Sequence, residues 1–289
     1  MEINKGLKLK VIGAGNVGMS IIEAFAQQGF NVVGIEVNDE VISRGKARVE
    51  KTLDKLVAKG KVSSEEKEAV LNRIHMTTDF EAVNDSDVVI EAIFEEIEIK
   101  KELFRRLDDT VKSDDALLLT NTSSLSVSEI ASATKRSARV AGMHFFNPVP
   151  VMKLVEVVRG VESSDDTIKK VVNLAQLMGK KPIICTDSPG FVVNRLLHML
   201  TIEASRIVEE GVASATDVDT GAKLGLGHAM GPFEVFDFLD GVPLFRTVCD
   251  YLETELGSRF KVPVWVKNYL RAGRTGRSCG KGFHDYTEK

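Results

Sequence analysis

The feature that most constrains this chain is a glycine-rich turn between a short apolar segment and an amphipathic one. Residues 9–12 lead directly into Gly13-Ala14-Gly15-Asn16-Val17-Gly18, after which apolar residues recur with helical spacing. In such a strand–turn–helix unit, Gly13 permits a tight turn, Gly15 lets the backbone approach a pyrophosphate, and Gly18 allows the helix to pack closely on the strand. The alternative is a purely structural turn.

An acid in the right place favours the binding interpretation. A second apolar segment at 32–36 ends in Glu36, 21 residues after Gly15. At that position a carboxylate hydrogen-bonds the adenosine ribose and repels a 2′-phosphate. The turn and this acid together predict a dinucleotide site, for NAD rather than NADP.

The first 190 residues alternate apolar runs with charged, helix-periodic stretches, which is typical of βαβ units and a mostly parallel sheet. We expect a Rossmann-type α/β domain with strands at 9–13, 32–36, 88–92, 117–121, 140–144, 154–158 and 182–185. A polar stretch at about 38–73, rich in Lys and Glu, predicts a helical pair interrupted at Gly60. It is longer than a crossover needs, so we expect an appendage over the active site.

The pattern changes at residues 187–190. Ser188 is expected to cap a helix with Pro189 at its first position, and Gly211 is expected near the end of that helix. Helices and glycine-rich turns are expected to follow. With 289 residues, two domains are predicted: a cofactor-binding domain over 1–187 and an all-helical domain over 188–289.

Composition excludes several classes of protein. The net charge of −4 gives no electrostatic basis for nucleic-acid binding, and no apolar run approaches the roughly 20 residues that a membrane helix needs. The N-terminal residues do not resemble a secretory signal. Cys185, Cys249 and Cys279 are far apart and have no metal-binding spacing, so free thiols, no metal and a cytoplasmic location are expected.

Two groups of polar residues follow predicted strands. Glu91, Glu95 and Lys100 lie at or after the segment 88–92, where the strands of an open α/β sheet reach the ligand crevice. They would face a cofactor there, or they would be solvated charges at a helix start. Residues 121–124, Asn-Thr-Ser-Ser, would likewise face the crevice or cap the next helix.

A histidine and a carboxylate form the candidate catalytic pair. His144 ends one apolar segment, and Glu156 lies in the middle of the next. A buried carboxylate needs a partner, and His144 would supply one. Such a pair provides the base that alcohol oxidation requires. Alternatively, Glu156 lies on an edge strand in water and His144 is only a packed residue. Asn194 would bind substrate across the crevice, or only cap and pack.

The motifs resemble the 3-hydroxyacyl-CoA dehydrogenase family, most nearly its short bacterial-type members, the 3-hydroxybutyryl-CoA dehydrogenases. The resemblance runs essentially end to end. It rests on residues 13–18, 91–95, 99–101, 121–125, 144–156, 189–195, 230–232 and 280–283.

The resemblance implies a reversible, NAD-dependent oxidation of an (S)-3-hydroxyacyl-CoA. It makes His144 the general acid/base and Glu156 its orienting partner. Ser123 and Asn194 would bind the reacting oxygen and the neighbouring carbonyl, and Lys59 the CoA moiety. A homodimer formed through the C-terminal domain is also implied. The implied cofactor contacts are Gly13, Gly15, Asn16, Val17, Gly18, Glu36, Glu95, Lys100, Asn121, Ser123 and Asn147.

Several positions depart from the family pattern, without touching the proposed acid/base pair. They are Asn16 and Val17 for Thr-Met, Ser20 for Gly, Glu36 for Asp, Ala229 for Pro and His284 for Tyr. Two other functions stay open on the residues alone: a dehydrogenase of the same architecture for a small hydroxy acid, and a non-catalytic NAD-binding protein.

Overall fold

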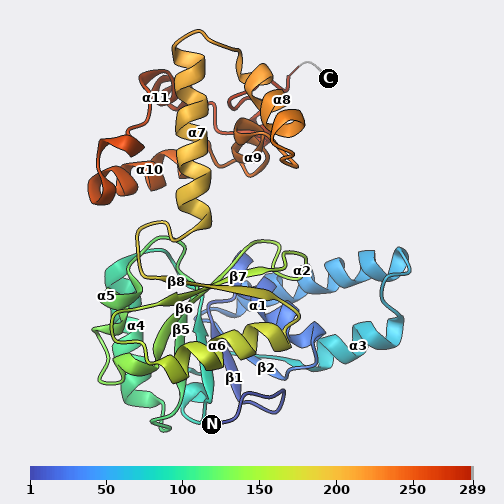
Figure 1. Ribbon diagram of the computed structural model, residues 1–289. Helices are drawn as coiled ribbons and strands as arrows, with labels where there is room; N and C mark the ends of the chain where they lie inside the picture. The colour runs from blue at the N-terminus through green and yellow to red at the C-terminus, as the bar shows by residue number, and fades with distance from the viewer. Residues whose placement is uncertain (288–289) are drawn as a thin grey trace. The chain divides into compact units, whose positions relative to one another are not determined.

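The computed structural model describes residues 1–287 and divides into two compact units, Met1–Ser188 and a second unit that begins at Pro189 (Figure 1). The hydrophobic residues gather into two clusters in the first unit and one in the second. Each unit therefore has a core of its own. None of the helices in the described part of the chain has the length and hydrophobicity that a membrane crossing requires.

The first unit is built on one eight-stranded sheet, in the order β3-β2-β1-β4-β5-β6-β7-β8. Neighbouring strands from β3 to β6 are parallel, β7 is antiparallel to β6, and β8 is parallel to β7. The predicted mostly parallel α/β fold is confirmed. The strands are β1 (Leu9–Ile12), β2 (Val32–Ile35), β3 (Ile74–Thr77), β4 (Val88–Glu91), β5 (Leu117–Thr120), β6 (Val140–Phe145), β7 (Leu154–Arg159) and β8 (Lys181–Thr186).

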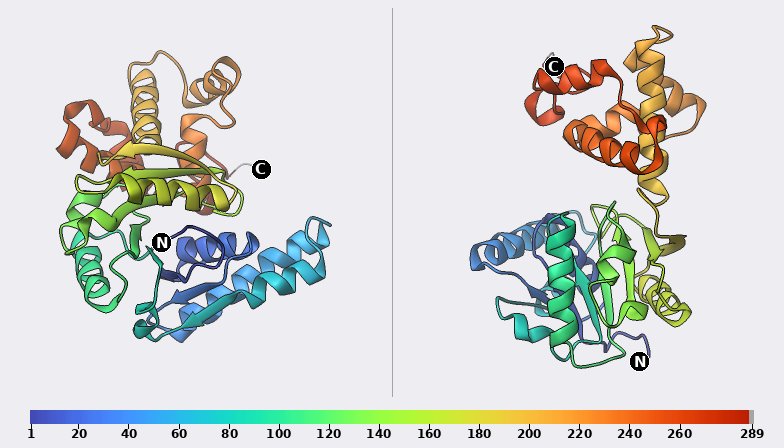
Figure 2. Two further views of the ribbon diagram at one scale, coloured as in Figure 1. Left: turned by 60° about the horizontal axis from the view of Figure 1, so that its bottom comes forward. Right: turned by 90° about the vertical axis from the view of Figure 1, so that its left-hand side faces the viewer.

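Helices cover both faces of this sheet, as the views in Figures 1 and 2 show. Helices α1 (Asn16–Gln27) and α6 (Asp165–Leu177) contribute to one core, while α4 (Ile97–Thr110) and α5 (Val127–Ala131) contribute to the other. Strands buried on both faces need apolar side chains on both, which accounts for the near-continuous apolar runs in the sequence.

The expected helical pair extends away from the sheet (Figure 2, left). Helix α2 (Asp39–Ala58) begins after Asn38, whose side chain accepts from the backbone N–H of Glu40. Gly60 adopts a positive φ of 64° that breaks the helix, and α3 (Ser64–Asn72) begins with a capping box. Local capping and one glycine therefore explain why this stretch forms two helices.

Two local predictions were wrong. Strand β3 was not expected, because only Ile74 of its four residues is buried at this edge of the sheet. The helix expected to start at Pro189 begins instead at Val193. Gly190 and Phe191 have positive φ values of 73° and 45°, which a right-handed helix cannot contain.

The second unit is helical, as predicted. Helix α7 (Val193–Glu209) is followed by Gly211, which has a positive φ of 72°. The three cysteines of the chain are free thiols. The α-helices of this unit are α7 (Val193–Glu209), α8 (Ala215–Gly225), α9 (Pro232–Phe238), α10 (Val242–Leu256) and α11 (Val264–Arg271).

Candidate active site

The glycine turn between β1 and α1 fits an anionic group. A Cβ added at Gly13 would lie 2.6 Å from the carbonyl oxygen of Ala92, and one added at Gly18 would collide with the backbone of Gly13. One added at Gly15 would meet no described atom within 4 Å, so the backbone there faces open space. Helix α1 has no side-chain cap and no acid in its first turn. Its N-terminal N–H groups therefore suit a pyrophosphate.

Glu36 lies immediately after β2 and reaches back to this turn. One carboxylate oxygen accepts from the backbone N–H of Ala14 and the other from that of Val37, both at 2.8 Å. The carboxylate is thus held beside the glycine turn before any ligand arrives. Asn16 lines a neighbouring groove, whereas the side chain of Val17 packs against the core. Val17 is partly buried there, at the first turn of α1.

Glu91, at the end of β4, and Glu95, after it, are not solvated helix-start charges. Lys100 is 1% exposed, and its ammonium lies 2.5 Å from Glu91 and 3.3 Å from Glu95. Glu95 in turn accepts from the backbone N–H of Ser123 at 2.8 Å and from the hydroxyl of Thr122 at 2.6 Å. Burial raises the pKa of Glu95, but Lys100 and these donors outweigh it, and the net pKa is lowered. Glu95 is thus a carboxylate at neutral pH.

The segment after β5 does not cap the next helix. Ser126 caps α5, since its hydroxyl accepts from the backbone N–H of Glu129. Asn121 makes a different contact, because its side-chain oxygen accepts from the backbone N–H of Phe145 at 2.9 Å. This bond ties the ends of β5 and β6 together, beside Ser123.

His144 and Glu156 lie opposite each other on the antiparallel strands β6 and β7. Nδ1 of the ring is 2.6 Å from a carboxylate oxygen of Glu156, and Glu156 is completely buried. The edge-strand alternative for Glu156 is wrong, because β8 pairs with the outer side of β7. The pair therefore has the geometry of a carboxylate that orients an imidazole.

Two residues for which the sequence analysis predicted no site role, Ser20 and Lys180, fix the loop after His144. The Ser20 hydroxyl accepts from the backbone N–H of Val149 at 3.1 Å, and the Lys180 ammonium donates to the carbonyls of Val149 and Met152. Burial lowers the pKa of Lys180. Neither residue carries a sequence signal, because the sheet order alone brings residue 180 to this loop.

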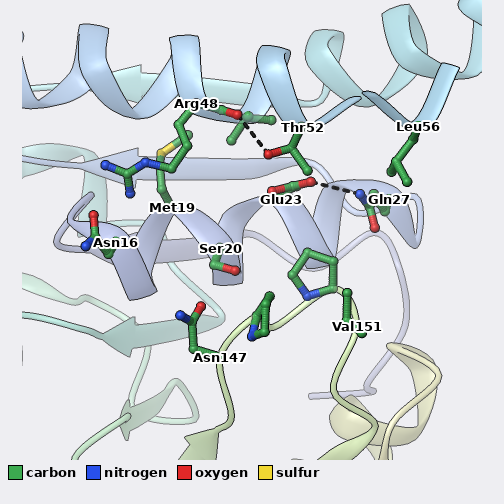
Figure 3. Close-up of a pocket in the computed structure, with 13 residues that line it drawn as sticks. Asn16, Met19, Ser20, Glu23, Gln27, Arg48, Thr52, Leu56, Asn147 and Val151 are labelled. Carbon is green, nitrogen blue, oxygen red and sulfur yellow. Dashed lines mark hydrogen bonds between the residues drawn. The ribbon is translucent and has the colours of Figure 1, made fainter. Parts of the chain in front are cut away.

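A groove of about 670 Å³ runs beside the glycine turn (Figure 3). Its walls are α1, α2 and the loop after β6, which carries Asn147 and Val151. Apolar side chains line about half of it, and the polar side chains are those of Asn16, Ser20, Glu23, Gln27, Arg48, Thr52 and Asn147. Such a mixed lining suits a long, amphipathic ligand.

Two predicted site residues come from other elements of the chain. Lys59 follows α2 as an exposed residue. Asn194 lies in the first turn of α7 in the second unit, and its backbone carbonyl is 2.7 Å from Nδ1 of His198. Among the described residues, no group of three or more His, Cys, Asp or Glu side chains is placed to hold a metal ion.

Comparisons with known proteins agree with this architecture. Residues 8–188 match the family model described as "3-hydroxyacyl-CoA dehydrogenase, NAD binding domain", and residues 190–286 match its "C-terminal domain". A probable 3-hydroxybutyryl-CoA dehydrogenase of Deinococcus radiodurans is 42% identical, over 97% of this chain and all of the relative. A 3-hydroxybutyryl-CoA dehydrogenase of Clostridioides difficile is 41% identical, over 98% of this chain and all of the relative.

A solved structure agrees equally well. The crystal structure of the (S)-3-hydroxybutyryl-CoA dehydrogenase PaaH1 from Ralstonia eutropha is 37% identical to this chain. It superposes with a TM-score of 0.92, over 97% of this chain and 99% of that one. Both domains of the fold are therefore covered by the likeness.

Proposed function

Because the chain belongs to the 3-hydroxyacyl-CoA dehydrogenase family, we propose that it catalyses the reversible, NAD-dependent oxidation of an (S)-3-hydroxyacyl-CoA to the 3-ketoacyl-CoA. The names of the Deinococcus and Clostridioides relatives support 3-hydroxybutyryl-CoA as the substrate. The observation that carries the proposal is the buried contact between His144 and Glu156.

In the oxidation, His144 acts as the base. With Nδ1 directed at Glu156, Nε2 takes the proton of the C3 hydroxyl group. The C3–H bond breaks with its electron pair, and the C3–O bond becomes a carbonyl. Bound NAD supplies the acceptor of this hydride. Glu156 holds the ring in one tautomer and stabilises the imidazolium that forms. In the reverse direction, His144 returns the proton.

The cofactor would lie across the carboxyl ends of β1 and β4, where the strand order reverses. The glycine turn, with Gly13, Gly15, Asn16, Val17 and Gly18, would hold the pyrophosphate. Glu36 would hold the adenosine ribose. Contacts to the nicotinamide half would come from Glu95, Asn121, Ser123 and Asn147. Lys100, whose side chain is 1% exposed, would act there through the Glu95 carboxylate that it holds.

Three residues are proposed to bind the acyl-CoA. Ser123 would hydrogen-bond the reacting oxygen, Asn194 the neighbouring carbonyl, and Lys59 the CoA moiety. The groove beside α1 and α2 has the mixed lining that a pantetheine arm requires, since that arm carries both amides and methyl groups. The helical pair would then be the part of the first unit that recognises CoA.

The second unit would serve substrate binding and dimerisation. Leu224 is 84% exposed, Val212 71% and Leu196 67%, which is much apolar surface for a small helical unit. A homodimer formed through this unit would cover it. Light scattering of the purified protein at micromolar concentration tests this: the mass of a single chain would contradict it.

One assay tests the main proposal. NADH absorbance is followed with acetoacetyl-CoA, with NADPH and free acetoacetate as controls. Rapid oxidation of NADH that requires the thioester is expected. Turnover of free keto acids alone would indicate a small hydroxy acid dehydrogenase instead. Binding of NADH without any turnover would indicate a non-catalytic NAD-binding protein.

A further inference from the structure

The buried carboxylate of Glu91 has no place in the reaction scheme above, although it lies at the cofactor end of the sheet. Glu91 is the last residue of β4, in register with Ile12 of β1 and Thr120 of β5. It is 0% exposed, so it cannot itself touch a ligand. Its effect on a ligand must therefore pass through the groups that it holds.

Each oxygen of Glu91 accepts hydrogen bonds within the protein. One accepts from the Lys100 ammonium at 2.5 Å and from the backbone N–H of Ile93 at 2.8 Å. The other accepts from the Thr120 hydroxyl at 2.7 Å. These three hydrogen bonds hold the carboxylate in one position, and the carboxylate in turn holds the ammonium of Lys100.

Lys100 connects Glu91 to a second carboxylate that lies nearer the surface. Its ammonium lies 3.3 Å from Glu95, whose other oxygen accepts from the backbone N–H of Ser123. A chain of contacts thus leads from the end of β4 to the loop that carries a proposed substrate ligand. We call Glu91, Lys100 and Glu95 the charged trio.

The charged trio holds two carboxylates and one ammonium, and its formal charge is −1. Glu91 and Lys100 are almost completely shielded from water and form a close ion pair, so the net negative charge resides chiefly on Glu95, whose side chain is 38% exposed. Without the charge of Glu91, Lys100 would neutralise Glu95 instead. The nicotinamide ring is positively charged in NAD⁺ and neutral in NADH. A fixed negative charge near the ring stabilises the first more than the second.

We propose that Glu91 is a positioning residue that holds Lys100, and through it Glu95 and Ser123, and that the net charge of the trio favours binding of NAD⁺ over NADH. This inference rests on the proposed function in one respect, namely that the nicotinamide half lies at this edge of the sheet. It concerns the ratio of two affinities rather than the rate of turnover.

The test measures the dissociation constants of NAD⁺ and NADH by calorimetry, for the wild-type protein and for Glu91→Gln. The substitution keeps the shape of the side chain and removes one negative charge. The ratio Kd(NADH)/Kd(NAD⁺) is expected to fall by about 3- to 10-fold. Equal weakening of both ligands, or no change, would overturn the proposal, because a merely structural role predicts one of those results.

Three further variants separate charge from structure. Thr120→Val removes a hydrogen bond to Glu91 without changing the charge, and Glu98→Gln removes an exposed charge on α4; both should leave the ratio unchanged. The double variant Glu91→Gln with Lys100→Met restores the net charge of −1 and should restore the ratio. A double variant with the same low ratio as Glu91→Gln would contradict the role of charge.

If Glu91→Gln does not fold, Glu95→Gln removes a charge of the same trio from a half-exposed position and must lower the same ratio. A failure of the proposed function would give a different set of binding and turnover results. A wild-type protein that binds neither NAD⁺ nor NADH would remove the cofactor site itself. A wild-type protein that reduces acetoacetyl-CoA, with an unchanged ratio in Glu91→Gln and in Glu95→Gln, would overturn only the inference about the trio.

Discussion

Nδ1 of His144 and a carboxylate oxygen of Glu156 lie 2.6 Å apart, at positions that face each other on two antiparallel strands. Strand pairing therefore sets the direction of the ring. A base held by a sheet keeps its geometry when nearby loops move, which suits a proton transfer that must coincide with departure of a hydride.

Replacement of the histidine should abolish most of the turnover. We expect His144→Ala to lower kcat by about 10²- to 10⁴-fold, because no other base replaces the ring, and to leave NADH binding nearly unchanged. Acetoacetyl-CoA reduction and NADH fluorescence titration measure the two effects. His75→Ala, at an exposed histidine on β3, is the matched control. Retained turnover in His144→Ala would remove His144 from the mechanism.

Glu156→Gln should reduce kcat less than His144→Ala does, because the base survives without its charged partner. The shape of the pH–rate profile should change, since an amide cannot stabilise an imidazolium as a carboxylate does. A full profile of kcat/KM for both proteins tests this, with the exposed Glu162→Gln as control. An unaltered profile would show that Glu156 does not act on the base.

Cofactor choice should depend on Glu36. In Glu36→Gln the repulsion of a 2′-phosphate is lost, so the preference for NADH over NADPH should fall by about tenfold or more. The comparison of kcat/KM for the two cofactors is the measurement. Glu40→Gln removes a carboxylate from the exposed start of α2 and should keep the preference. If both variants discriminate as the wild type does, another residue selects the cofactor.

The stability of the first unit should fall as pH rises, through Glu23. Burial raises the pKa of this carboxyl from 4.5 to about 7 in the folded protein. The folded state then binds the proton more tightly than the unfolded state, and the stability that this provides below pH 4.5 is lost as pH rises through 7. The loss is about 3 kcal/mol.

Urea denaturation at pH 5 and pH 8.5, followed by circular dichroism, tests this prediction. Glu23→Gln should be the more stable protein at pH 8.5 and should show a smaller difference between the two pH values. Equal pH dependence in both proteins would mean that Glu23 is ionised in the folded state as readily as in water.

His198 should act in the opposite direction in the second unit. Burial lowers its pKa to about 4, although a hydrogen bond to the carbonyl of Asn194 opposes this shift. The unfolded state therefore binds the proton more tightly, and stability falls as pH falls from about 6.5 toward 4, by about 3 kcal/mol.

Trp265, the single tryptophan, lies in the same unit and reports its unfolding by fluorescence. In His198→Leu, the urea midpoint seen by this probe should hardly change between pH 7 and pH 5. A midpoint that drops in the variant as steeply as in the wild type would place the acid sensitivity elsewhere.

The seven predicted strands could be found from the sequence because strands covered on both faces are almost continuously apolar. Strand β3 lacks this signal because it lies at the sheet edge with one buried residue. The start of α7 was misplaced for a different reason. Ser188 and Pro189 carry the local signals of a helix start, but the turn at Gly190 packs against Leu252, 62 residues away. A contact between residues so far apart in the sequence cannot be predicted from the local sequence pattern.

The candidate site, like the fold, could be predicted from the sequence only in part. Residue type and position at a strand end indicated Glu36 and His144, and a carboxylate in the middle of an apolar segment indicated Glu156. A hydrogen-bond partner could be predicted only where the sequence offered one nearby candidate, as it offered His144 for Glu156. The Ala14 backbone bond of Glu36 and the Lys180 clamp depend on sheet order and loop path, which periodicity does not encode.

Strand β8 has a consequence for where the first unit can be cut. A chain shortened to end near residue 160 would keep His144, Glu156 and the whole glycine turn. Its β7 would then present an open row of backbone donors and acceptors to other copies, inviting strand addition and aggregation. A cofactor-binding unit expressed by itself must therefore continue through Thr186, because β8 pairs with the outer edge of β7, the strand that carries Glu156.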